Sequence, residues 1–157
     1  DVGQNQIWTA NYFKVKGGRF ITSGGMGTMG YSIPAAIGAK LASPDSQVIA
    51  VCGDGSLQMQ SMELATIMQN NIPVKIIVMT NKRLGMVREV QTRLYENRQI
   101  AVNLDGSPDF IKLAEAYSIP AIRISNSDEA DEAIDRMLSA ETPFFIECMV
   151  SPEESTL

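Results

Sequence analysis

Gly53-Asp54-Gly55-Ser56 directly follows an apolar run, Val48-Ile49-Ala50-Val51-Cys52, and a second apolar run at residues 74–79 ends at Thr80-Asn81. Both runs have the length and the β-branched content of buried strands. Loops that leave the carboxyl ends of neighbouring parallel strands converge on one crevice, so we expect Asp54 and Asn81 to meet in space. The pattern predicts a three-layer α/β/α domain with a mostly parallel sheet.

The residue types at this predicted crevice suit a divalent cation and a phosphate group. Mg²⁺ prefers oxygen ligands and is commonly completed by substrate phosphates and water, so one carboxylate, one amide oxygen and one carbonyl can suffice. Gly53 and Gly55 let the backbone approach an anion closely, and Ser56 is expected to start a helix whose amino terminus favours phosphate. Asp-Gly is also common in simple tight turns, so the residues alone leave a turn without function open.

Length and composition limit the classes of protein. With 157 residues, 45% of them hydrophobic and 20% charged, the chain is predicted to be one globular domain. The net charge of −5 and the lack of a basic cluster argue against nucleic acid or an acidic membrane surface as partner. The absence of histidine excludes His-based triads and histidine metal sites.

The remaining composition signals concern the compartment. No apolar run is long enough to span a membrane, and no signal peptide is visible. Cys52 and Cys148 each lie in an apolar run, and neither their number nor their spacing suggests a disulfide framework. We therefore expect reduced core cysteines and a cytoplasmic protein.

Blocks of sequence between residue 1 and about residue 116 resemble the acetohydroxyacid (acetolactate) synthase large subunit, a thiamine-diphosphate enzyme. Gly53-Asp54-Gly55-Ser56 with Asn81 is similar to the diphosphate-binding motif of such enzymes. The chain has no initiator Met, so we expect residues 1–157 to be the cofactor-binding domain of a longer polypeptide. The other matching blocks are Asp1-Val2-Gly3-Gln4, residues 22–31, residues 34–39, residues 73–76, Leu84-Gly85-Met86-Val87 and residues 108–116.

The resemblance implies thiamine diphosphate and Mg²⁺ as cofactors. Asp54, Asn81 and the backbone carbonyl of Arg83 would bind the metal, and Met29 would wedge between the two cofactor rings and keep the cofactor bent. Asn5 stands where the family usually has His, and its amide can still donate to a phosphate oxygen, without a charge. The implied cofactor contacts are Gly3, Gln4, Asn5, Gly27, Met29, Gly53, Asp54, Gly55, Ser56, Asn81 and Met86.

The implied activity is that of acetolactate synthase in branched-chain amino-acid biosynthesis, where pyruvate is decarboxylated and the resulting enamine is joined to a second 2-oxoacid. In the family the catalytic Glu comes from a pyrimidine-binding domain of the partner subunit, and FAD, where retained, binds a middle domain. We expect no catalytic residue in residues 1–157 and no synthase activity from them alone. The full-length enzyme would be a homodimer or tetramer, open to a regulatory small subunit.

One departure bears on substrate choice. Biosynthetic members typically carry Trp at the position of Val90, and that Trp is associated with 2-ketobutyrate preference and with herbicide binding. Val90 leaves a less aromatic wall, which argues against both properties here.

Two other functions stay open. Another thiamine-diphosphate 2-oxoacid decarboxylase or oxidase would share the motif around Asp54. A catalytically inactive assembly or regulatory module is the non-enzyme alternative, and it would have no physical need for Asp54, Asn81 and Met29 together.

The remaining elements are predicted from periodicity and turn residues. Trp8, Tyr12 and Phe13 are expected to pack as the apolar face of the first helix. Residues 93–106 are predicted to be mobile, residues 151–157 form a polar tail, and the acidic residues 128–135 are interpreted as a solvated helix face. Helices are predicted at 4–13, 34–42, 57–70, from 84 onward, at 109–117 and from 127 or 128 to 139, with strands at 20–22, 119–124 and 144–150.

Overall fold

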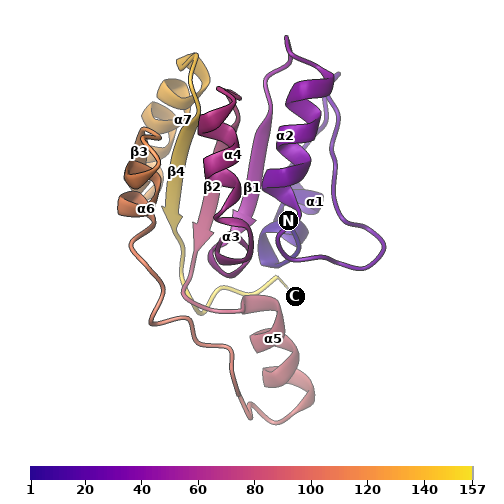
Figure 1. Ribbon diagram of the computed structural model, residues 1–157. Helices are drawn as coiled ribbons and strands as arrows, with labels where there is room; N and C mark the ends of the chain where they lie inside the picture. Colours follow the sequence, from indigo (N-terminus) through magenta and orange to yellow (C-terminus); the bar gives the residue numbers. More distant parts are fainter. Residues whose placement is uncertain (157) are drawn as a thin grey trace.

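The protein is described here by a computed structural model of residues 1–156. Within these residues, four parallel strands form one sheet in the order β1-β2-β4-β3 (Figure 1). Because every pairing is parallel, the carboxyl ends of all these strands lie at the same edge. The predicted parallel sheet is confirmed, and its strands are β1 Ile49–Gly53, β2 Lys75–Thr80, β3 Ala121–Ile124 and β4 Phe144–Met149.

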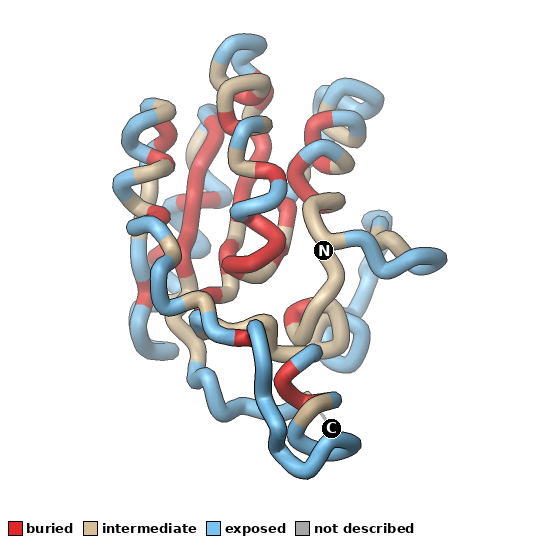
Figure 2. The backbone as a smooth tube through the Cα atoms, turned by 60° about the horizontal axis from the view of Figure 1, so that its bottom comes forward, coloured by how far each residue is buried: buried red, intermediate tan, exposed pale blue. Residues whose placement is uncertain are grey.

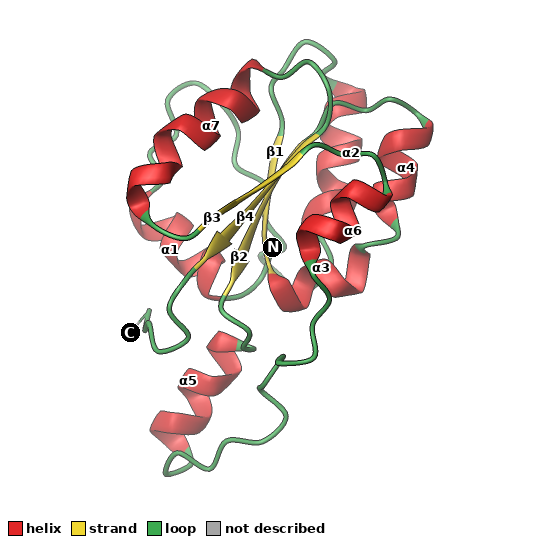
Figure 3. Ribbon diagram, turned by 90° about the vertical axis from the view of Figure 1, so that its left-hand side faces the viewer, coloured by secondary structure: helices red, strands yellow, loops and turns green. Residues whose placement is uncertain are grey.

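Helices cover both faces of the sheet and complete the three predicted layers, as Figure 3 shows. One face carries α2 (Ser32–Ala42), α3 (Asp54–Gln60), α4 (Glu63–Gln69) and α6 (Phe110–Ala116). The other carries α1 (Gln4–Tyr12) and α7 (Ala130–Ser139), the latter preceded by a short 3-10 helix, η1 (Ser127–Glu129). Helix α5 (Gly85–Leu94) lies beyond the carboxyl ends of the strands instead of on a face (Figure 1).

The core has two parts because neighbouring strand residues point to opposite faces. Ile76 and Val78 are fully buried in the larger cluster, beneath α2 and α4. Ile77 packs instead with Met137 of α7 in the smaller cluster. Figure 2 shows the buried backbone concentrated in the sheet and its adjoining helices, while the segments after α1 and after α5 are exposed.

Two of the predicted elements are wrong. The helix predicted at 57–70 is divided, because the Leu64 N–H bonds to the Ser61 carbonyl and the Ala65 N–H to the Met62 carbonyl, three residues back instead of four. Residues 20–22 form no strand, and Ile21 is 53% exposed. A short β-branched segment becomes a strand only where a neighbouring strand supplies ladder bonds.

The aromatic residues of α1 also depart from expectation. Trp8 stacks on Tyr12 with 5.4 Å between ring centroids, but Tyr12 is 71% and Phe13 59% exposed. The predicted packing is therefore wrong for the end of this helix. No helix within residues 1–156 combines the length and the apolar character that a bilayer span requires.

Candidate functional site

A cavity of about 620 Å³ opens at the carboxyl ends of β1 and β2. Its walls are the loops after these strands, the segment after β4, and the first turns of α1 and α5. Val90 does not line it and is 41% exposed on α5. Every predicted cofactor or metal residue does line it: Gly3, Gln4, Asn5, Gly27, Met29, Gly53, Asp54, Gly55, Ser56, Asn81, Arg83 and Met86.

Asp54 is a buried carboxylate, only 2% exposed. Its Oδ1 atom accepts a 2.8 Å hydrogen bond from the Gly55 N–H, and Oδ2 accepts one of 2.6 Å from the Lys82 N–H. Burial raises the pKa of Asp54, and the backbone N–H groups of Lys82 and Gly55 oppose that rise. No side chain within residues 1–156 forms an ion pair with Asp54. A buried carboxylate without a countercharge is costly, so the site suits a cation.

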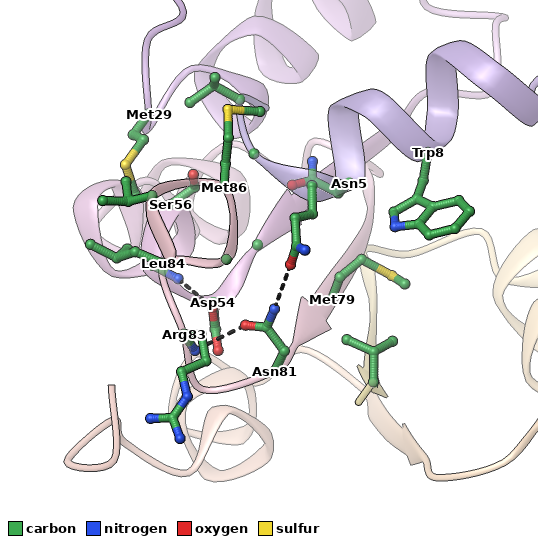
Figure 4. A pocket seen from close by; sticks show the side chains of 18 of the residues that line it. Asn5, Trp8, Met29, Asp54, Ser56, Met79, Asn81, Arg83, Leu84 and Met86 are labelled. Atoms are coloured by element: carbon green, nitrogen blue, oxygen red, sulfur yellow. Dashed lines mark hydrogen bonds between the residues drawn. The ribbon is translucent and has the colours of Figure 1, made fainter. Parts of the chain in front are cut away.

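Asn81 presents an amide oxygen beside this carboxylate, as Figure 4 shows. The Oδ1 atom accepts a 2.9 Å bond from the Arg83 N–H, which closes a tight turn. The Nδ2 atom donates to Oε1 of Gln4 over 2.9 Å. Within residues 1–156 no group of three or more His, Cys, Asp or Glu could hold a metal. A hard cation here would therefore be held by one carboxylate together with amide, carbonyl and ligand oxygens.

The loop that carries Arg83 forms backbone hydrogen bonds with residues 102–104. The Leu84 N–H donates to the Val102 carbonyl over 2.8 Å, and the Leu104 N–H donates to the Lys82 carbonyl over 2.9 Å. The Arg83 guanidinium also bonds to the Asn103 side chain. These contacts fix the backbone of Arg83, although residues 102–104 fall in a segment that the sequence predicted to be mobile.

Glycines allow the walls of the cavity to approach each other. A Cβ atom on Gly55 would lie 2.7 Å from Leu84 Cδ2 and 3.2 Å from Met29 Cε. Gly27 has a φ of 62°, which side chains rarely adopt. At the start of α5, the N–H groups of the first turn have no partner within the helix, so Gly85 and Met86 offer donors toward the cavity.

Asn5 is held in place by one bond of its side-chain amide. The residue is 8% exposed, and its Nδ2 atom donates to the Asp1 carbonyl over 3.0 Å. An amide NH₂ group has two N–H donors, so donation from Asn5 to a phosphate stays a prediction.

Sequence reasoning missed part of the wall. Trp8 lines the cavity on the side opposite Met29 (Figure 4), and Val150, Ser151 and Glu154 line it from the tail. The tail follows the carboxyl end of β4, which pairs with β2 in parallel. Loops that follow neighbouring parallel strands converge, so the argument used for Asp54 and Asn81 could also have predicted that the tail lines the cavity.

Known proteins resemble this chain along most or all of its length. The family described as "Thiamine pyrophosphate enzyme, C-terminal TPP binding domain" matches residues 1–148. The chain is 48% identical over 156 residues to a probable acetolactate synthase large subunit of Methanococcus aeolicus, covering 99% of this chain and 26% of that protein. It is 44% identical over 158 residues to the acetolactate synthase large subunit of Lactococcus lactis, covering 100% of this chain and 27% of that protein.

A solved structure is also similar. The thiamine diphosphate-dependent 4-hydroxybenzoylformate decarboxylase of Rhodococcus jostii superposes with a TM-score of 0.74 at 35% sequence identity. The match covers 81% of this chain and 24% of that one. The chain thus spans about a quarter of the length of the relatives it matches.

Proposed function

The chain belongs to the thiamine pyrophosphate enzymes, as their C-terminal cofactor-binding domain, and we propose that it holds thiamine diphosphate and Mg²⁺ for an acetolactate synthase. The proposed Mg²⁺ binding is supported mainly by the surroundings of Asp54. Asp54 is buried without an ion-pair partner in residues 1–156, beside the amide oxygen of Asn81, at the wall of a large cavity. A divalent cation would supply the missing countercharge.

Each part of the cavity has a role in this proposal. Asp54, Asn81 and the carbonyl of Arg83 bind the cation, and the backbone N–H groups after Gly53 and at the start of α5 hold the diphosphate. Gln4 supports Asn81 from the side. Bound thiamine diphosphate supplies the carbon nucleophile and accepts the electrons released on decarboxylation. Met29, Met86 and Gly27 form the apolar wall that positions the cofactor rings and excludes water.

The activity proposed for the whole enzyme is decarboxylation of pyruvate followed by condensation with a second 2-oxoacid. The names of the relatives support it: one, from Methanococcus aeolicus, is named a probable acetolactate synthase large subunit, and one, from Lactococcus lactis, an acetolactate synthase large subunit. The proposal places the catalytic Glu and any FAD site in other domains of a dimer or tetramer, with room for a regulatory small subunit. Residues 1–157 alone are then inactive, and synthase turnover by them would contradict this.

The proposed compartment is the cytoplasm. Cys52 and Cys148 are free thiols, and burial raises the pKa of Cys52 to about 12. Stable unpaired cysteines are typical of a reducing compartment.

Calorimetric titration of thiamine diphosphate with and without Mg²⁺ tests the metal part of the proposal. We expect Mg²⁺-dependent binding that Asp54→Ala abolishes, because the variant removes the only buried carboxylate of the proposed ligand set. Asp105→Ala is the matched control, since that carboxylate is 72% exposed and lies near the same loop. The titration is made on this chain and on the full-length dimer, and absence of binding in both would refute the proposal.

A second candidate is a 2-oxoacid decarboxylase, which the similarity to the Rhodococcus jostii enzyme favours. Product analysis with pyruvate and the full-length enzyme separates the two reactions. Acetolactate supports the synthase, whereas acetaldehyde as the main product supports the decarboxylase.

Val90 is proposed to weaken the preference for 2-ketobutyrate as second substrate. The residue lies on α5, whose first turn lines the cavity. We expect Val90→Trp to shift competition between 2-ketobutyrate and pyruvate toward 2-ketobutyrate. Leu94→Trp, one turn later on the same helix, is the matched control, because Leu94 is 74% exposed and does not line the cavity.

A further inference from the structure

We propose that Glu89 is a positioning residue for the cation site, because it fixes through Gln4 which atom of the Asn81 amide faces the cation. The proposal rests on the function proposed above. It assigns a role to a buried carboxylate that neither lines the cavity nor bonds to the proposed metal ligands.

The relay begins at Glu89, which is 4% exposed and, when ionised, can only accept hydrogen bonds. Its Oε1 atom accepts a 2.6 Å bond from Nε2 of Gln4. The same nitrogen donates to the Glu154 carbonyl over 2.9 Å. Two acceptors on this side determine that the NH₂ group of Gln4 faces them. The carbonyl oxygen of Gln4 must therefore point the other way.

That oxygen determines the orientation of Asn81. Oε1 of Gln4 accepts a 2.9 Å bond from Nδ2 of Asn81, so Oδ1 of Asn81 is left on the side of Asp54 and Arg83. If the amide of Asn81 were reversed, two oxygens would face each other at Gln4. The reversed amide would also point its NH₂ group at the cation, which cannot bind it.

Glu89 is itself held in place by the tail. The Thr156 N–H donates to Oε1 of Glu89 and the Thr156 hydroxyl to Oε2, both over 2.7 Å. Burial opposes ionisation of Glu89, but hydrogen bonds from Thr156, Gln4 and Ser155 outweigh it and lower the pKa. Glu89 thus stays an acceptor at neutral pH, and the whole relay has one consistent arrangement of donors and acceptors.

The first test uses the full-length enzyme and measures the Mg²⁺ concentration that half-saturates thiamine diphosphate binding, by calorimetry. Glu89→Gln would leave one acceptor oxygen for Gln4 and the Thr156 N–H, and its NH₂ group could donate to the Thr156 hydroxyl, so it keeps the relay. Glu89→Leu removes both acceptor oxygens, so Gln4 and Asn81 lose their fixed orientation. We expect the half-saturating concentration to rise about tenfold, the low end for residues that orient metal ligands. Glu115→Leu is the matched control, because Glu115 is exposed on α6 and lies outside the cavity and the relay. An unchanged value in Glu89→Leu would overturn the proposal.

The same Glu89 replacement is then made in the Asn81→Asp variant. This comparison separates an effect on the orientation of residue 81 from a general effect on the structure of α5. Asn81→Asp carries oxygen at both terminal positions, so its orientation no longer matters to the cation. We expect Glu89→Leu to cause no further rise in this background. An equal rise in both backgrounds would show that Glu89 only supports the fold and would overturn the relay. Asp54→Ala tests the proposed cation site separately. If this variant keeps Mg²⁺-dependent binding, the cation site itself is refuted, whatever the result for Glu89.

Discussion

Gln4 and Gly85 are the first residues of α1 and α5, and a Cβ atom on Gly85 would lie 1.9 Å from Oε1 of Gln4. The same atom would lie 3.0 Å from Nδ2 of Asn81. The amino ends of two helices therefore meet the proposed metal ligand at a point where no side chain fits. A side chain at position 85 would displace Gln4 and break the hydrogen bond from Nδ2 of Asn81 to Oε1 of Gln4, so only glycine leaves that bond intact.

Gly85→Ala should accordingly displace Gln4 and weaken Mg²⁺-dependent binding of thiamine diphosphate. The atoms met are the ends of side chains that can turn away, so we expect the free energy of unfolding to fall by about the value of one lost hydrogen bond, about 0.5–1.5 kcal/mol. Gly38→Ala is the control, because Gly38 lies on the exposed side of α2 with open space around it. That change should stabilise the chain by about 0.5–1 kcal/mol. Urea unfolding measures both, and equal effects would contradict the assigned crowding.

Glu89 should contribute stability that depends on pH. Its folded-state pKa is lowered from the ordinary value of 4.5, so the unfolded state binds the proton more tightly than the folded state. The contribution is then fully present above pH 4.5 and is lost as the pH falls through the lowered folded-state pKa. Urea unfolding of the wild type and of Glu89→Gln, from pH 7 down to pH 3, should show their difference shrink below pH 4.5. A difference independent of pH would rule out this linkage.

Asn126 should be the residue that starts the last helical segment. Its Oδ1 atom accepts from the N–H groups of Asp128 and Glu129 over 3.0 and 3.2 Å. We expect Asn126→Ala to cost about 1 kcal/mol in the free energy of unfolding, the usual loss for such a cap. Ser127→Ala is expected to cost much less, although the sequence had suggested Ser127 or Asp128 as the cap. A larger loss from Ser127→Ala would reverse the assignment.

Arg123 should stabilise a buried carboxylate in β4. Glu147 is 3% exposed and accepts from Nε of Arg123 over 2.7 Å and from the Thr80 hydroxyl over 3.1 Å. Breaking a fully buried pair costs about 3–5 kcal/mol, but the Arg123 side chain is 41% exposed, so we expect about 2 kcal/mol for Arg123→Met. Arg123→Met combined with Glu147→Met should recover part of that loss in urea unfolding. No recovery would mean that the arginine acts through its other contacts, which include a 2.8 Å bond to Asp109.

The parallel sheet could be predicted because each buried strand corresponds to a short, continuous apolar run in the sequence. The apolar runs at 48–52 and 74–79 differ by one residue from β1 and β2. Burial on both faces requires such continuous apolar runs in a parallel sheet. The segment at 20–22 has similar residues but no neighbouring strand, and a short sequence does not contain that information.

The residues of the candidate site also fall into those that the sequence could predict and those that it could not. Asp54 and Asn81 follow predicted strands, so the edge rule was enough to bring them together. Gly27 and Met29 were available only from the resemblance, since a glycine-rich loop has no periodicity that fixes its path. The bonds from Thr156 and Gln4 to Glu89 join segments far apart in the chain, and no local pattern encodes them.

The tail that closes the relay also sets an order of assembly. During synthesis, β1 and β2 can pair while Gln4 still lacks the Glu154 carbonyl and Glu89 still lacks Thr156. The relay from Glu89 to Asn81 is complete only after residue 156 has been synthesised. Until then Gln4 and Asn81 lack the contacts that fix their amide orientation, so the cation site is ordered later than the pairing of β1 with β2.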